Sequence, residues 1–187
     1  MRYALGLKEQ AIVCEALGRG LQTVAIRKGG IEDLDDAERL QIPERPFLLL
    51  PARFHEGEMP VHLGFRERLR DHLPRRFEGQ FQVHYGATVV SETFVESADA
   101  LVRLAPLQAF TEDELRKRFA YRTPGVHVLT LRAYRLRDAI FVPDSPETAG
   151  CRSWIELPEP HACESVPVLT DDTFAEQAAA VAAILNC

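Results

Sequence analysis

The sequence has few cysteines to form disulfides or bind zinc, and it has no long apolar run to span a membrane. Its 187 residues include one tryptophan and four cysteines. The cysteines form no CxxC pair, so neither a zinc knuckle nor a disulfide framework is expected. No apolar run approaches the roughly 20 residues that a membrane-spanning helix needs. After Arg2 the start becomes charged again at Lys8-Glu9, too soon for the apolar segment of a signal peptide. We therefore expect a cytoplasmic protein with reduced thiols, no membrane association, no metal and no cofactor.

Positive charge is also in short supply. Lysine and arginine number 22 against 28 acidic residues, which gives a formal net charge of −6. A protein that binds nucleic acid without regard to sequence is usually basic, so the composition argues against that class. It leaves room for a local basic groove on an acidic body. Hydrophobic residues make up 46% of the chain, enough for the core of one globular domain spanning residues 1–187.

Hydrophobic periodicity predicts helices and strands connected mainly by loops. Because regular crossover helices do not separate the strands, the pattern indicates an α+β fold. We expect a mixed or antiparallel curled sheet, or a small barrel, flanked by helices. The predicted helices are Leu7–Leu17, Thr111–Tyr121 and Asp171–Leu185, and the predicted strands are Gln22–Lys28, Phe47–Leu50, Phe81–Val95, Val126–Arg137 and Ser153–Leu157.

Local signals refine three of these elements. Thr111–Glu114 is a capping box, which predicts a helix start. One of Asp171–Asp172 is expected to cap the last helix. Along Val126–Arg137, strand alternation predicts that Leu129 and Leu131 face the core while the basic side chains face solvent.

A series of motifs runs in order along nearly the whole chain. These motifs are Leu7-Lys8-Glu9, Arg27-Lys28-Gly29-Gly30-Ile31, Phe47-Leu48-Leu49-Leu50-Pro51 with His55 beyond it, Leu131 to Leu136, Gly150 to Leu157 and Pro167-Val168-Leu169. In these motifs the sequence resembles the bacterial domain-of-unknown-function family number eighteen-oh-two. Some members of that family are joined to restriction-endonuclease domains of the Mrr type. The resemblance therefore implies a link to DNA restriction and a restriction-endonuclease partner.

The region Phe81–Leu157 is similar to PUA-like barrels in its order of strand, helix and strand, the last ending in Tyr134-Arg135-Leu136. That superfamily includes readers of modified bases. The resemblance implies a small PUA-like barrel and nucleic-acid recognition.

Two cations and two glycines form the first candidate site. Arg27, Lys28, Gly29 and Gly30 follow the predicted strand end. Exposed backbone N–H groups and adjacent positive charge can bind an anion. The alternative is a β-turn with solvated basic residues, and the spacing of a P-loop is missing.

The only tryptophan lies in a second candidate site, Arg152, Ser153 and Trp154. Strand alternation would place Arg152 and Trp154 on the same face, with Ile155 facing the core. A guanidinium beside an indole can stack on a base. Alternatively, Trp154 packs in the core.

Three further residues are candidates for the same ligand site. His55 could act as a general base or hold a ligand, although a loop histidine is more often plain polar surface. Arg132 and Tyr134 lie on a predicted strand whose basic face could converge with Arg27 and Arg152.

An arginine-rich stretch could contact nucleic-acid phosphates through Arg66, Arg68 and Arg70. The alternative is a solvated helix face in which these residues pair with Glu67 and Asp71.

Three functions stay open. The leading hypothesis is a non-enzymatic nucleic-acid recognition module, possibly for modified DNA. The second is a metal-dependent nuclease or other hydrolase that uses Glu9, Lys28 and His55. The third is a small-molecule or partner-binding module, which the acidic net charge favours. The sequence does not define the oligomeric state.

If the arginine-rich stretch contacts phosphates, the double variant Arg68→Ala/Arg70→Ala should bind nucleic acid less tightly. The log–log dependence of affinity on salt should become shallower by about 0.7–0.9 for each phosphate that is no longer neutralised. Titrations at several salt concentrations measure both quantities. Unchanged affinity and slope would identify the stretch as a solvated face.

Overall fold

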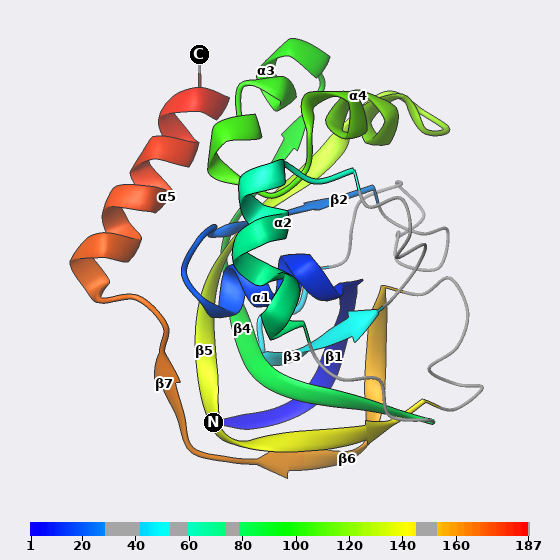
Figure 1. The fold of residues 1–187 in the computed structure, drawn as a ribbon, viewed down its shortest axis with the longest axis vertical. Coiled ribbons are helices and arrows are strands. Elements are labelled where there is room, and N and C mark those ends of the chain that lie inside the picture. The colour runs from blue at the N-terminus through cyan, green and yellow to red at the C-terminus, as the bar shows by residue number, and fades with distance from the viewer. Residues whose placement is uncertain (29–41, 53–59, 74–78, 145–152, 187) are drawn as a thin grey trace.

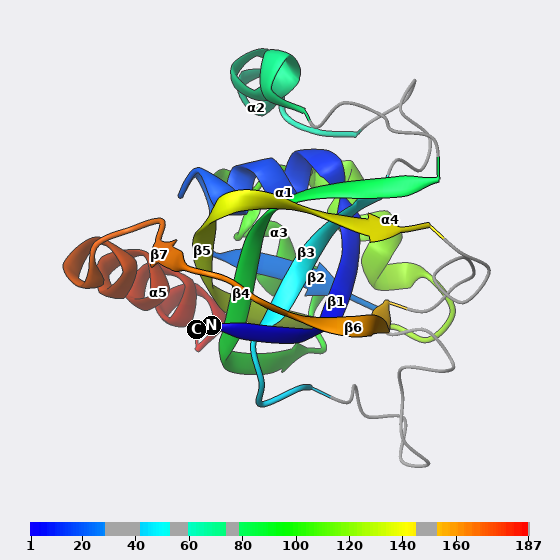
Figure 2. The ribbon, with the colours of Figure 1, turned by 90° about the horizontal axis from the view of Figure 1, so that it is seen from below.

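A single curled sheet forms the centre of the computed structural model, which describes residues 1–28, 42–52, 60–73, 79–144 and 153–186 (Figures 1 and 2). The strand order is β2-β5-β4-β3-β1-β6, and the short β7 pairs with β5. β1 and β3 are parallel, whereas the other pairs are antiparallel. The mixed, curled sheet with flanking helices confirms the α+β prediction. The strands are β1 (Arg2–Gln10), β2 (Val24–Arg27), β3 (Phe47–Ala52), β4 (Gln80–Val95), β5 (Val126–Pro143), β6 (Trp154–Ala162) and β7 (Ser165–Pro167).

The two longest strands give the sheet its curl. β4 and β5 pair over most of their length, and their register shifts between Val83 and Tyr85 and again between Val89 and Ser91. Such irregularities bend a strand and increase its twist. The curl brings the two ends of the strand order towards each other. Among the described residues, no backbone pairing joins β2 to β6, so the sheet stays open.

Five α-helices and two 3₁₀ turns accompany the sheet in the described part of the chain. Every residue of α1 is buried, and α2 lies outside it (Figure 2). α3 and α4 lie side by side, and α5 runs along the flank beyond β7 (Figure 1). The helices are α1 (Ala11–Gly18), α2 (Leu63–Leu69), α3 (Ala98–Val102), α4 (Glu112–Ala120) and α5 (Asp171–Leu185), with 3₁₀ turns η2 (Arg70–His72) and η3 (Ala105–Leu107).

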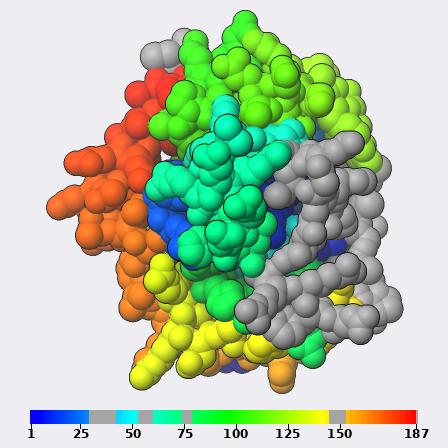
Figure 3. All heavy atoms as spheres, in the orientation of Figure 1, coloured from blue at the N-terminus to red at the C-terminus, as the bar shows by residue number. Residues whose placement is uncertain are grey.

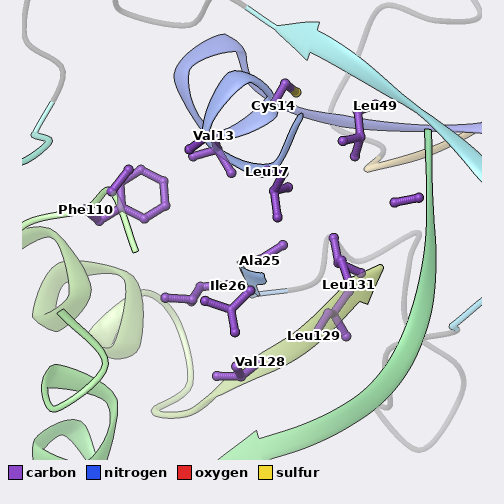
Figure 4. Packing of buried hydrophobic residues seen from close by; sticks show 14 of the residues in the cluster. Val13, Cys14, Leu17, Ala25, Ile26, Leu49, Phe110, Val128, Leu129 and Leu131 are labelled. Carbon is purple, nitrogen blue, oxygen red and sulfur yellow. The ribbon is translucent and has the colours of Figure 1, made fainter. Parts of the chain in front are cut away.

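The buried side chains form two clusters. In the larger one, Leu17 of α1 points towards Ala25 of β2 and Leu131 of β5 (Figure 4). The smaller cluster includes Tyr3, Leu48, Leu50, Leu136 and Ile155. β1, β3, β4 and β5 contribute residues to both clusters.

The predicted helix Leu7–Leu17 is wrong in its first part. β1 continues to Gln10, and the helix begins at Ala11. Leu7 pairs with Leu49 of β3 and with Trp154 of β6. Pairing on both sides overrides the local helical periodicity, as tertiary context often does.

The predicted solvated face of β5 is wrong for the first half of the strand, whereas Arg135 and Arg137 further along are exposed. Val126 to Ala133 are all buried, including His127 and Arg132, because both faces of this segment are covered. Thr111 caps α4 as predicted, accepting a hydrogen bond from the Glu114 N–H at 3.4 Å. The cap of α5 is Thr170, not an aspartate. The described helices include none that is long and apolar enough to cross a membrane.

Candidate functional site

The side chain of Arg27 joins three strands at one end of the sheet. Its Nη1 donates to Glu9 Oε2 at 2.8 Å and to the Lys8 carbonyl at 3.2 Å. Its Nη2 donates to Ser153 Oγ, immediately before β6. We call Glu9, Arg27 and Ser153 the Arg27 cluster. One guanidinium thus links β2, at one end of the strand order, with β1 and the start of β6 at the other.

The Arg27 cluster is shielded from water. The Arg27 side chain is 13% exposed and that of Glu9 is 3% exposed. Glu9 Oε1 accepts a further hydrogen bond from the Gln10 N–H at 2.7 Å. Arg27 Nε is buried and has no hydrogen-bond partner among the described residues. The cluster is therefore a buried ion pair that keeps one donor unused.

Cys14 of α1 lies next to this ion pair, and its thiol contacts the Glu9 carbonyl at 3.7 Å. Burial raises the pKa of the Cys14 thiol well above its ordinary value, and the nearby carboxylates of Glu9 and Glu15 raise it further. The thiol is therefore protonated at neutral pH, which does not suit a nucleophile.

Lys8 adds a second cation at the same end of β1. Lys8 is only 7% exposed, and its N–H donates to the Ser153 carbonyl at 2.8 Å. Strand alternation places its side chain on the face of β1 opposite that of Glu9. The parallel register pairs Lys8 with Leu50 of β3. Lys8 therefore lies next to the Arg27 cluster in the chain, but its side chain is on the other face of β1.

Trp154 lies where β6 begins, and its ring packs against the core. The indole meets the ring of Phe47 edge to face, with centroids 4.9 Å apart and an interplanar angle of 85°. It is half-buried against the larger hydrophobic cluster, and the next residue, Ile155, belongs to the smaller one. These contacts fit the core alternative better than an open stacking face.

Lys28 follows Arg27 in the chain, but its side chain does not join the Arg27 cluster. Its ammonium donates to the carbonyls of Phe119 at 2.8 Å, Gly125 at 2.6 Å and Thr123. Desolvation lowers the pKa of Lys28. The side chain thus holds the end of α4 and the following turn, and it does not meet the Glu9 carboxylate that the hydrolase hypothesis pairs with it.

Arg132 holds the start of α5. It donates to the Leu169 carbonyl at 2.8 Å, to Asp171 Oδ1 at 2.7 Å and to the Thr170 carbonyl at 3.2 Å. Its guanidinium also lies 4.6 Å from the centre of the Phe174 ring. These contacts account for the burial of Arg132 in structural terms.

The remaining predicted residues are dispersed or lie outside the described part of the chain. Tyr134 is half-buried on β5 and pairs with Pro167 of β7. The arginine-rich stretch lies on α2 and η2 at the front of the molecule (Figure 3), where Arg66, Arg68 and Arg70 are exposed. Gly29, Gly30, His55 and Arg152 lie outside the described residues.

The described histidines, cysteines and acidic residues include no group of three placed to hold a metal ion. Of the predicted ligand residues, the structure brings together Arg27 and Ser153, with Trp154 beside them. From the sequence, Glu9 entered only the hydrolase hypothesis, and Lys8 had no role. The sequence did contain a signal for these two residues, because Lys8 and Glu9 are charged and directly follow the apolar stretch Tyr3–Leu7.

The model of the family DUF1802, described as a domain of unknown function, matches residues 6–180. The chain belongs to this family. Among curated proteins, none matches it significantly. The DUF1802 chain is similar to solved structures of ASCH from Zymomonas mobilis. One shows 10% identity and a TM-score of 0.45, covering 94% of this chain and 93% of the other. A serine-to-alanine variant of that protein gives 10% identity and a TM-score of 0.47, with 94% of each chain covered. Similarities this distant carry no statement about function.

If the Arg27–Glu9 pair joins the ends of the sheet, Arg27→Met should lower the free energy of unfolding by roughly 3–5 kcal/mol, because Glu9 would be left buried without its counter-charge. The double variant Arg27→Met/Glu9→Met should lose less than the sum of the two single variants. Chemical denaturation measures the cycle. Arg45→Met is a suitable control, since it breaks an exposed pair with Glu156 and should cost less than about 1 kcal/mol. Additive losses for Arg27 and Glu9 would contradict this role.

The packing of Trp154 predicts a structural effect. Trp154→Ala should lower the free energy of unfolding by roughly 3 kcal/mol, because it leaves a void beside Phe47. Tyr121→Ala, which removes an exposed aromatic ring, should change it by no more than about 0.5 kcal/mol. Equal, small effects of both variants in denaturation experiments would return Trp154 to the list of ligand-binding residues.

Proposed function

We propose that this DUF1802 protein is a nucleic-acid recognition module whose ligand binds where β1 ends and β6 begins. The observation that carries the proposal is the buried Arg27 guanidinium, whose Nε–H has no partner among the described residues. A buried donor without a partner is costly, so a ligand that supplies an acceptor is favoured there.

The local charge points to the same class of ligand. Glu9 is matched by Arg27 at 2.8 Å, and Lys8 adds positive charge to this end of β1. Charges act more strongly in a site shielded from water than at the surface. Positive charge combined with hydrogen-bond donors suits the phosphate oxygens and base acceptors of a nucleic acid. The proposal requires donors and positive charge only locally, so it is compatible with the net charge of −6.

DNA, and modified DNA in particular, is the narrower form of this proposal. It is supported by the resemblance to proteins joined to Mrr-type restriction-endonuclease domains, and a restriction-endonuclease partner belongs to the same hypothesis. Titrations with unmodified and modified DNA duplexes and with RNA of the same sequence would separate these ligands.

The proposal predicts that Lys8→Gln weakens nucleic-acid binding about tenfold or more, the magnitude of one charge-assisted hydrogen bond. Fluorescence anisotropy with labelled DNA and RNA measures the affinity, and thermal melts establish that the variant is folded.

The matched control is Lys117→Gln, which removes an exposed lysine on α4 and should leave the affinity within about twofold. Equal losses for the two variants would show that binding follows overall surface charge, which would contradict a site at the end of β1. Absence of binding to every nucleic acid would contradict the proposed function itself.

A further inference from the structure

A second site of a different kind lies between β5 and β7. There the surface is hollowed into a cavity of about 710 Å³, within the range of small-molecule sites. The cavity shares no lining residue with the Arg27 cluster or with Lys8. Its lining includes Arg135, Leu136, Arg137, Glu164, Ser165 and Val166.

The pairing of β5 with β7 determines which side chains face this cavity. Val166 lies directly opposite Arg135 in the antiparallel register, so their side chains share one face of the ribbon. Arg137 lies two residues from Arg135, on the same face. Leu136, between them, is buried in the smaller core cluster. The cavity therefore has two guanidinium groups and an exposed valine on one wall.

Part of the positive charge in this wall is available to a ligand. Arg137 Nη1 lies 2.6 Å from Glu164 Oε2, and both side chains are well exposed. Arg135 is exposed and forms no ion pair with the described residues. Burial raises the pKa of the nearby Tyr85 to about 12, and the guanidinium groups of Arg19 and Arg135 oppose this rise. Arg135 thus contributes positive potential to this part of the protein, and no carboxylate among the described residues pairs with it.

The cavity also has an apolar surface. Val166 is 62% exposed, so its side chain is accessible to a ligand. Ser165 accepts a hydrogen bond from the Tyr3 hydroxyl at 3.2 Å, which fixes this side of β7 against β1. A wall that offers both an available guanidinium and an exposed apolar side chain is complementary to a ligand with both characters.

We propose that the cavity between β5 and β7 binds a small organic anion, with its anionic group on Arg135 and its apolar part against Val166. This site is independent of nucleic-acid recognition at the end of β1.

The dye anilinonaphthalene sulfonate, an aromatic anion, is a direct probe of the cavity. We expect saturable binding to the folded protein, measured by dye fluorescence. Arg135→Ala should weaken it about tenfold, as expected for one charge-assisted hydrogen bond. Val166→Asp should also weaken dye binding, because the aspartate repels the anionic dye and the apolar surface of the valine is lost. Glu164→Gln should strengthen it about two- to threefold, because it removes a negative charge from the wall.

Two control variants match these changes elsewhere on the surface. Arg116→Ala removes an exposed arginine of α4, and Val90→Asp alters a valine that is 56% exposed on β4. Both should leave dye binding unchanged. Thermal melts of all variants exclude dye binding to a loosened state. Phenyl phosphate and benzoate, used as competitors, identify which anionic group the cavity prefers.

The proposal is overturned if Arg135→Ala and Val166→Asp behave like their controls, or if neither competitor displaces the dye. Anisotropy with labelled nucleic acid, repeated on Arg135→Ala, keeps the two sites apart. The affinity for nucleic acid should be unchanged in this variant, and either site can therefore fail without the other.

Discussion

One buried guanidinium links the two ends of the sheet. Backbone pairing among the described residues runs from β2 through β5, β4, β3 and β1 to β6 and stops there. Arg27 continues the connection through side-chain bonds to Glu9 and Ser153. The planar guanidinium is suited to this position because it donates in several fixed directions and keeps its charge when buried. The position of the end of β1 relative to β2 and to the start of β6 therefore depends on this contact.

A second polar network holds α1 on the sheet. Glu15 of α1 is buried, accepts the Tyr85 hydroxyl hydrogen bond at 3.1 Å and pairs with Arg19 at 2.9 Å. Glu9, just before α1, and Glu15, within it, thus bring negative charge into the interior, and each is matched by an arginine. Buried carboxylates require such partners because desolvation of an unpaired charge is costly. Every residue of α1 is buried, and the two networks together fix the helix between β1 and β4.

The sequence allowed the prediction of features whose cause is local. β3 is a short apolar run, and the N-cap of α4 is a hydrogen bond between Thr111 and Glu114, three residues apart. Features caused by distant residues were not predictable. Leu7 is in a strand because it pairs with β3 on one side and β6 on the other. Arg132 is buried because the start of α5 packs against it. Ser153 was named as a candidate, but its contact with Arg27 spans 126 positions of the chain, and no pattern of spacing reveals such a pair.

The distribution of cations reconciles an acidic chain with anionic ligands. Arg27, Lys28 and Arg132, which looked like a binding surface in the sequence, are largely engaged in holding strands and helices together. The groups proposed to meet a ligand are instead the spare Nε–H donor of Arg27 at the end of β1 and the Arg135 guanidinium between β5 and β7. Because potential near a surface is set by nearby groups, a few such residues are sufficient to attract an anion to a protein whose net charge is negative. The structural arginines therefore determine where those few residues lie.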